Sequence, residues 1–189
     1  MAKTVLNLIM TFDGYVAGAH DEIDWIASTT SAAAAAATGE AQQWDFSEFT
    51  NQVGAIIVGK RSYDLGLQQG WFKDNAYGPS PIFVLCESAP EQPSKEADFR
   101  FVNDIDEMYK QASDAAGDKL IYLFGGPSVF QQFLNKDLVD EMRLTIAPIL
   151  IGKGIRLFDN LTERHVQLEK TKLIEHPGSM IEVYYKIVK

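Results

Sequence analysis

Several features that mark particular classes of protein are missing from this chain of 189 residues. Its single cysteine, Cys86, excludes an internal disulfide framework and a zinc site built on several cysteines. No segment reaches the roughly 18 apolar residues that a membrane-spanning helix requires. The short apolar run near the start lacks the small-residue pattern of a cleaved leader. We therefore expect a soluble, cytoplasmic protein.

Positive charge is also scarce. The chain has 17 Lys and Arg against 26 Asp and Glu, which gives a net charge of −9. A nucleic-acid-binding protein needs a basic face, so this balance argues against that class. A phosphorylated small molecule needs only a few cations in one cleft, and cations stand near glycines at Lys60-Arg61 and at 153–156. The three histidines are scattered in turn-like contexts, so we expect no metal site.

Two common nucleotide-binding fingerprints are absent as well. The chain has no Walker A loop, which argues against an ATPase, and no G-x-G-x-x-G motif. The segment 152–156, "GKGIR", comes nearest to the latter but lacks the third glycine and a following helix. Any nucleotide would therefore bind by other means.

Strand-like and helical patterns alternate along most of the chain. Strands are predicted at 4–10, 55–58, 80–88, 99–102, 120–124, 140–150 and on both sides of 176–178, and helices at 104–118 and 127–134. Strands that alternate with helices predict a largely parallel sheet covered on both faces. The last strands add antiparallel pairs, so we expect a mixed sheet in one α/β domain over residues 1–189.

The segment between the first two long strands is harder to interpret. Trp44, Phe46, Phe49 and Val53 predict an amphipathic helix that ends near Gly54. The six alanines at 32–37 fit a helix or a flexible loop. Because these alanines carry no distinctive chemistry, the sequence does not show which residues form a substrate pocket.

Two strand-to-helix junctions carry glycine. Gly59 precedes Lys60, and Gly125-Gly126 precede Pro127, a residue that suits the first position of a helix. Glycine lets a ligand approach the backbone, and the free amides of a first helical turn favour an anion such as phosphate. A tight turn that binds nothing explains an isolated Gly-Gly equally well. Ligands of open α/β sheets bind at the carboxyl ends of strands, so two such junctions suggest a dinucleotide.

Four blocks of the sequence carry a family resemblance. They are "NLIMTFDGYVAG", "AIIVGKRSYD", "IYLFGGPSVFQQFL" and "LVDEMRLTIAPILIGKGIRLF", and their order and spacing agree with the family. The chain resembles the dihydrofolate-reductase-like superfamily, in the bacterial branch similar to the C-terminal reductase domain of the bifunctional riboflavin-biosynthesis deaminase/reductase. The resemblance implies a three-layer α/β/α sandwich around a mixed, mostly parallel eight-stranded sheet. It also implies an NADPH-dependent reductase acting on a pterin-like or ribosylaminopyrimidine-like substrate, and a homodimer.

The resemblance assigns cofactor binding to the two glycine junctions. The residues that match are Gly59, Lys60, Arg61, Ser62, Gly125, Gly126, Pro127 and Ser128. The first four stand at the family's G-R-x-T motif, with Lys60 in place of its Arg and Ser62 in place of its Thr. Lysine keeps the positive charge of arginine but lacks the guanidinium that binds a phosphate through two hydrogen bonds. The glycine pair matches the family's paired glycines, whose peptide bond is often cis and faces the pyrophosphate.

The chain departs from the family after the third predicted strand. The family often carries Thr-Arg or Ser-Arg there, against the adenosine phosphate, whereas this chain has Cys86-Glu87. A carboxylate repels a 2′-phosphate, so NADH remains open beside NADPH. A non-catalytic nucleotide-binding or dimeric scaffold protein is the alternative function, because fold alone does not fix function.

The resemblance also suggests a proton donor. In the folate-reducing branch, a carboxylate on the helix before the G-R-x-T strand donates the proton, with a phenylalanine one turn later. Asp45 precedes Phe49 by four residues, and residues four apart share a helix face. We therefore predict Asp45 as the catalytic residue. An exposed residue of the first helical turn is the alternative interpretation.

Overall fold

The computed structural model describes residues 2–29, 47–162 and 165–189. Contacts between Cα atoms divide the chain into two compact units. The first unit is Met1–Leu6 with Phe46–Val139, and the second is Asn7–Asp45 with Asp140–Lys189. No helix in the described ranges is long and apolar enough to cross a membrane.

Eight strands form one sheet in the order β5-β4-β3-β6-β1-β7-β10-β9. Their bounds are β1 Thr4–Thr11, β3 Val53–Gly59, β4 Ile82–Leu85, β5 Phe99–Val102, β6 Leu120–Gly125, β7 Glu141–Ala147, β9 Gln167–His176 and β10 Met180–Val188. The pairs β5-β4, β4-β3, β3-β6 and β6-β1 are parallel, whereas β7-β10 and β10-β9 are antiparallel. The predicted mixed, mostly parallel sheet is confirmed.

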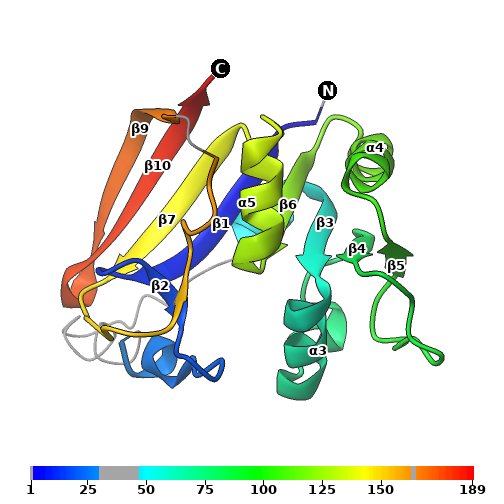
Figure 1. Cartoon of the computed structure of the whole chain (residues 1–189), viewed down its shortest axis with the longest axis horizontal. Helices are drawn as coiled ribbons and strands as arrows, with labels where there is room; N and C mark the ends of the chain where they lie inside the picture. The colour runs from blue at the N-terminus through cyan, green and yellow to red at the C-terminus, as the bar shows by residue number, and fades with distance from the viewer. Residues whose placement is uncertain (1, 30–46, 163–164) are drawn as a thin grey trace. The chain divides into compact units, whose positions relative to one another are not determined.

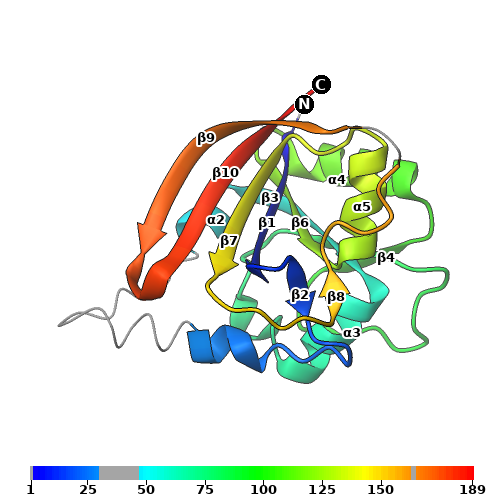
Figure 2. The same cartoon turned by 60° about the vertical axis from the view of Figure 1, so that its left-hand side comes forward.

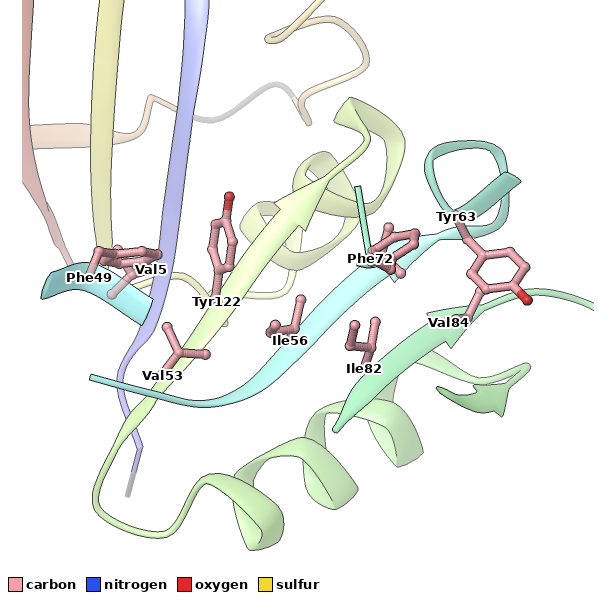
Figure 3. Close-up of a cluster of buried hydrophobic side chains, with 10 residues drawn as sticks. Val5, Phe49, Val53, Ile56, Tyr63, Phe72, Ile82, Val84 and Tyr122 are labelled. Atoms are coloured by element: carbon pink, nitrogen blue, oxygen red, sulfur yellow. The ribbon is translucent and has the colours of Figure 1, made fainter. Parts of the chain in front are cut away.

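The first unit carries helices on both faces of its strands. Its helices are α2 Ser47–Thr50, α3 Lys60–Gln69, α4 Ile105–Ala116 and α5 Pro127–Asn135. Alternate side chains of β3, among them Ile56 and Val58, pack with Tyr63 of α3 and with Phe72 on one face (Figure 3). The helices α4 and α5 cover the other face, where Tyr109 meets Phe133 edge-on with ring centroids 6.2 Å apart.

These strands are buried because their sequences are apolar on both sides. In β3, every residue from Ala55 to Gly59 is buried. A continuous apolar run is typical of a parallel strand covered on two faces, whereas a half-exposed strand alternates apolar and polar residues. The predicted start of a helix at residue 104 is also confirmed, because Asp104 is the N-cap of α4 and its carboxylate accepts hydrogen bonds from the N–H groups of Asp106 and Glu107.

The predicted helix that ends near Gly54 is wrong at its carboxyl end. Helix α2 ends at Thr50, and Val53 already pairs with Leu120 of β6. At Gly54, a Cβ would lie 2.7 Å from the carbonyl oxygen of Ala116, so this glycine allows close packing of β3. Apolar spacing alone did not separate the end of a helix from the start of a strand. The six alanines and Trp44 lie outside the described residues.

The second unit contains the antiparallel part of the sheet. Figure 2 shows β9 and β10 as a long hairpin beside β7. Its turn is the short 3₁₀ segment η2, Pro177–Ser179, where the sequence predicted a turn. A separate pair joins β2, Tyr15–Ala17, to β8, Ile155–Arg156. The strand predicted at 140–150 is shorter, because β7 ends at Ala147.

Asp13 holds together the two loops of the second unit that flank β2 and β8. Its carboxylate accepts hydrogen bonds from the N–H of Gly152 at 2.8 Å and from the N–H of Ile151 at 3.2 Å. The hydroxyl of Thr11 donates to the same carboxylate at 2.6 Å and accepts from the N–H of Tyr15 at 3.0 Å. Asp13 is therefore a turn residue, and it also fixes the distant loop that follows β7.

We predict that Asp13→Ala loosens this loop. The substitution leaves the N–H groups of Ile151 and Gly152 without their carboxylate acceptor, and Lys153 offers trypsin a site beside them. Limited digestion should cleave the variant after Lys153 several-fold faster than the wild type. Asp159→Ala, which removes an exposed acid, is the control and should leave the rate unchanged. Equal rates in all three proteins would contradict the role of Asp13.

The same contacts predict a pH dependence. The hydrogen bond from the Thr11 hydroxyl is the main cause that lowers the pKa of Asp13 below its ordinary 3.8, and it outweighs the effect of desolvation. A lowered pKa stabilises the folded loop above the ordinary value, and the stabilisation is lost as the pH falls through the folded value. The amide resonances of Ile151 and Gly152 should therefore stay unchanged from pH 7 to about 4 and move only below it. Movement near pH 5 would contradict this assignment.

Candidate functional site

The two glycine junctions lie side by side in the first unit. Strands β3 and β6 are parallel neighbours, and Val58 pairs with Gly125 (Figure 1). A Cβ on Gly59 would lie 3.7 Å from the backbone nitrogen of Gly126 and 2.9 Å from Cγ2 of Val129. The structure therefore brings the ends of both strands into contact, which the sequence alone did not fix.

Both junctions open helices that no side chain caps. Gly59 is the N-cap of α3 and Gly126 the N-cap of α5, and neither first turn contains an acidic residue. The contrast is α4, which follows β5 and is capped by the carboxylate of Asp104. On α5, Pro127 has no N–H and the N–H of Val129 donates to the carbonyl of Gly126, so the first turn offers the N–H of Ser128. Free N–H groups of a first turn and the positive end of the helix dipole favour an anion in front of both α3 and α5.

The glycines of the pair have different reasons to be glycine. Gly125 has φ of 131°, a conformation that other residues rarely adopt. Gly126 has φ of −80°, which any residue tolerates, but a Cβ there would lie 2.9 Å from the hydroxyl oxygen of Ser62. The peptide bond between the two is cis, as the resemblance implies. One glycine therefore turns the chain, and the other keeps the space beside Ser62 open.

The polar side chains of the two first turns differ in their surroundings. Lys60 forms an ion pair with Asp64 at 2.6 Å, and its side chain is 39% exposed. This pair lowers the positive charge that Lys60 offers to a phosphate. Arg61 is exposed on the first turn of α3, and Ser62 lies half-buried. On α5, Pro127 occupies the first position, and the Ser128 hydroxyl accepts from the Gln132 amide at 3.4 Å.

An open pocket of ≈ 360 Å³ adjoins this site. It is lined by Cys86, Glu87, Ser88, Ala89, Phe101, Val102, Asn103, Glu107 and Gln111. Its position follows from the strand register, because Gly59 pairs with Leu85 and Leu85 pairs with Val102. The pocket therefore begins one residue beyond the partners of Gly59, at the same carboxyl edge.

The sequence pointed to only part of this pocket. Cys86 and Glu87 belong to the strand predicted at 80–88, which ends at Leu85 in the structure, whereas Glu107 and Gln111 come from α4 and were not singled out. A sequence signal for this pair did exist. The Asp104 cap fixes the start of α4, and Glu107 and Gln111, four residues apart, must then lie on one face of the helix. Burial raises the pKa of the Cys86 thiol, an effect that the nearby charge of Lys60 opposes. The thiol is thus protonated at neutral pH, which disfavours a nucleophilic role.

The predicted catalytic residue, Asp45, lies outside the described residues. Phe49, its predicted companion, is buried on α2 and meets Tyr122 of β6 edge-on at 4.9 Å between ring centroids. Phe49 thus belongs to the core of the first unit.

Comparisons with known proteins agree with this geometry. Residues 2–180 match the family described as the RibD C-terminal domain. The uncharacterized protein YyaP of Bacillus subtilis (strain 168) is 27% identical over 191 residues, which cover 97% of this chain and 94% of that protein.

Two solved structures extend the likeness to three dimensions. A putative riboflavin biosynthesis protein from Shewanella sp. PV-4 superposes with a TM-score of 0.82 at 26% identity and full coverage of both chains. A diaminohydroxyphosphoribosylaminopyrimidine deaminase/5-amino-6-(5-phosphoribosylamino)uracil reductase from Thermotoga maritima shares the fold, with a TM-score of 0.69 at 15% identity over 99% of this chain and 57% of that one.

Proposed function

We propose that this chain, which belongs to the RibD C-terminal domain family, is a reductase that binds a nicotinamide dinucleotide and reduces a small heterocycle. The resemblance implies NADPH as the cofactor and a pterin-like or ribosylaminopyrimidine-like substrate. Membership of the family supports the enzyme class, and the activity, substrate and cofactor are our proposal.

The observation that carries the proposal is the contact between the glycine junctions. Two uncapped helix N-termini meet where Gly59 lies beside Gly126. A pyrophosphate offers two linked anionic groups, one for the first turn of α3 and one for the N–H of Ser128 on α5, and this matches two neighbouring helix N-termini better than a single phosphate does. The space kept open at Gly126 allows the backbone to approach such a group closely.

The residues of this site bind and orient and do not themselves react. The first turns of α3 and α5 would hold the pyrophosphate, with Arg61 adding charge. When bound, the dinucleotide supplies the hydride. Reduction of a C=N or C=O bond also needs a proton, from a side chain or from ordered water.

Asp45 is our proposed proton donor. Asp45→Asn should lower turnover by about a hundredfold or more, in line with the usual contribution of general acid catalysis. It should also abolish the alkaline limb of the pH profile, because a general acid is active only while it is protonated. Turnover and pH profile are to be compared with the wild type once an acceptor is found. An unchanged profile would remove Asp45 from the mechanism.

A titration with each dinucleotide tests the proposal. A ligand that binds only the folded state at 100 times its Kd stabilises it by about 2.7 kcal/mol, which thermal denaturation detects readily. We expect NADPH or NADH to raise the melting temperature and to be oxidised in the presence of a heterocyclic acceptor. Binding without oxidation by any acceptor would favour the alternative, a non-catalytic nucleotide-binding scaffold. No shift with either dinucleotide would contradict the proposal.

We also propose that the protein is a homodimer that pairs through the exposed apolar face of β9. The apolar stretch 142–151 suggests a surface for pairing, but its strand, β7, is an interior strand of the sheet with Met142 and Leu144 buried. On β9, Leu173 pairs with the buried Val183 of β10, yet it is 51% exposed. Cross-strand partners share a sheet face, so β9 continues a buried face whose side chains no described residue buries. A second copy is the partner we propose for it.

A charge on this face should disrupt the dimer. Leu168, 40% exposed, pairs with the buried Ile187, whereas the adjacent Gln167 points to the opposite face. Leu168→Glu should give a monomer near 21 kDa in sedimentation at micromolar concentration, and Gln167→Glu should sediment like the wild-type dimer. A monomeric wild type would contradict the proposal, and an equal effect of both variants would contradict the assigned face.

A further inference from the structure

We infer that the open pocket beyond β4 and β5 receives the adenosine half of the dinucleotide and selects NADH over NADPH. This inference rests on the proposed function, because it assumes a dinucleotide whose pyrophosphate lies at the two glycine junctions. It specifies which of the two dinucleotides that site prefers, and it favours NADH, whereas the resemblance implies NADPH.

The position of the pocket supports the first half of the inference. Neighbouring strands lie about 4.8 Å apart, so the ends of β4 and β5 are about 5 and 10 Å from the end of β3. Leu85, the register partner of Gly59, is followed directly by Cys86 and Glu87 of the pocket. The Lys60–Asp64 pair influences the Cys86 thiol, which places the first turn of α3 within electrostatic range of the pocket. A ribose attached to a pyrophosphate at Gly59 therefore has the pocket as its neighbour.

The pocket suits the half of the dinucleotide that does not react. Hydride transfer is favoured where water is excluded and a second ligand meets the nicotinamide ring. Here most of the lining side chains, including Glu87, Asn103 and Glu107, are exposed, and the pocket is open. Such a surface holds a ribose and a base without enclosing them.

The charge of the pocket supports the second half of the inference. Among the described residues that line it, two are carboxylates, Glu87 and Glu107, and none is Lys, Arg or His. Lys60, whose charge acts on the Cys86 thiol of the pocket, is already paired with Asp64. Carboxylates accept hydrogen bonds from ribose hydroxyls, as in NAD-binding sites, whereas a 2′-phosphate requires a cation. A phosphate dianion facing Glu87 and Glu107 meets like charge and finds no partner.

Binding measurements on the full chain test this specificity. We expect NADH to bind at least about tenfold more tightly than NADPH in calorimetric titrations at low salt. Glu87→Gln and Glu107→Gln should each reduce the difference in affinity between NADH and NADPH by strengthening NADPH binding. Each variant removes a negative charge that repels the 2′-phosphate and keeps a polar group. Glu91→Gln, an exposed acid of the same loop outside the pocket lining, is the matched control and should change neither affinity.

The single cysteine reports where the ligand lies. Alkylation of Cys86 at alkaline pH should slow several-fold with NADH or ADP-ribose present, and nicotinamide mononucleotide should give no protection. Protection by the mononucleotide alone, or binding of NADH without protection, would overturn the placement of the adenosine half. Equal affinities, or tighter binding of NADPH, would overturn the selectivity and leave the proposed function standing. Absence of binding by either dinucleotide would overturn both.

Discussion

Gly126→Val should abolish dinucleotide binding while the protein remains folded. The φ of −80° at Gly126 suits valine, so the backbone need not change. A side chain there would occupy the space beside the Ser62 hydroxyl, which lies 2.9 Å from an added Cβ and can rotate away. We expect affinity to fall by about a hundredfold or more, equivalent to about 2.7 kcal/mol, because the pyrophosphate loses its approach to both helix N-termini. Calorimetric titration measures the loss.

Gly54→Ala is the control for this variant, because it lies at the opposite end of β3. Its Cβ would meet the Ala116 carbonyl oxygen at 2.7 Å, so the variant should unfold at lower urea concentration but bind the dinucleotide as the wild type does. The two glycines thus separate stability from binding. Wild-type affinity in Gly126→Val would count against the site.

Phe72→Ala should destabilise the first unit more than any surface change. Phe72 is 1% exposed and packs among the rings of Tyr63, Tyr77, Phe99 and Phe124, with centroids 5.2 to 6.3 Å away. Truncation removes these contacts and leaves a cavity that rigid neighbouring rings fill poorly. The expected cost is about 3–5 kcal/mol in the free energy of unfolding, measured by urea denaturation.

Phe12→Ala is the matched control, since Phe12 is 73% exposed. The free energy of unfolding of this variant should stay within about 0.5 kcal/mol of the wild-type value. A cost below about 1 kcal/mol for Phe72→Ala would show that the aromatic cluster repacks, and it would contradict the expected cavity.

The sequence predicted the parallel part of the fold well for physical reasons. In β3 and β6 the apolar runs are continuous because both faces are covered, and Gly and Pro mark where each strand passes into a helix. The cap at Asp104 uses only local hydrogen bonds, so it was readable from a few residues. The family resemblance, confirmed by the match over residues 2–180, supplied the eight-stranded mixed sheet.

Features that depend on distant contacts were not readable. The start of β3 at Val53 is set by pairing with Leu120, not by the apolar spacing that suggested a helix. The β2–β8 pair and the two amide hydrogen bonds to Asp13 join segments more than 130 residues apart. Glu107 lines the pocket together with Glu87 because α4 packs against β4 and β5.

The most direct test of the dinucleotide site is an NMR titration that follows backbone amides. If the two helix N-termini hold the pyrophosphate, adding a dinucleotide should shift the amide resonances of Arg61, Ser62 and Ser128 most strongly. The resonances of Gly54 and Ala116, at the opposite end of β3, should stay unchanged. Shifts that leave both first turns unaffected while the ligand binds would contradict the account.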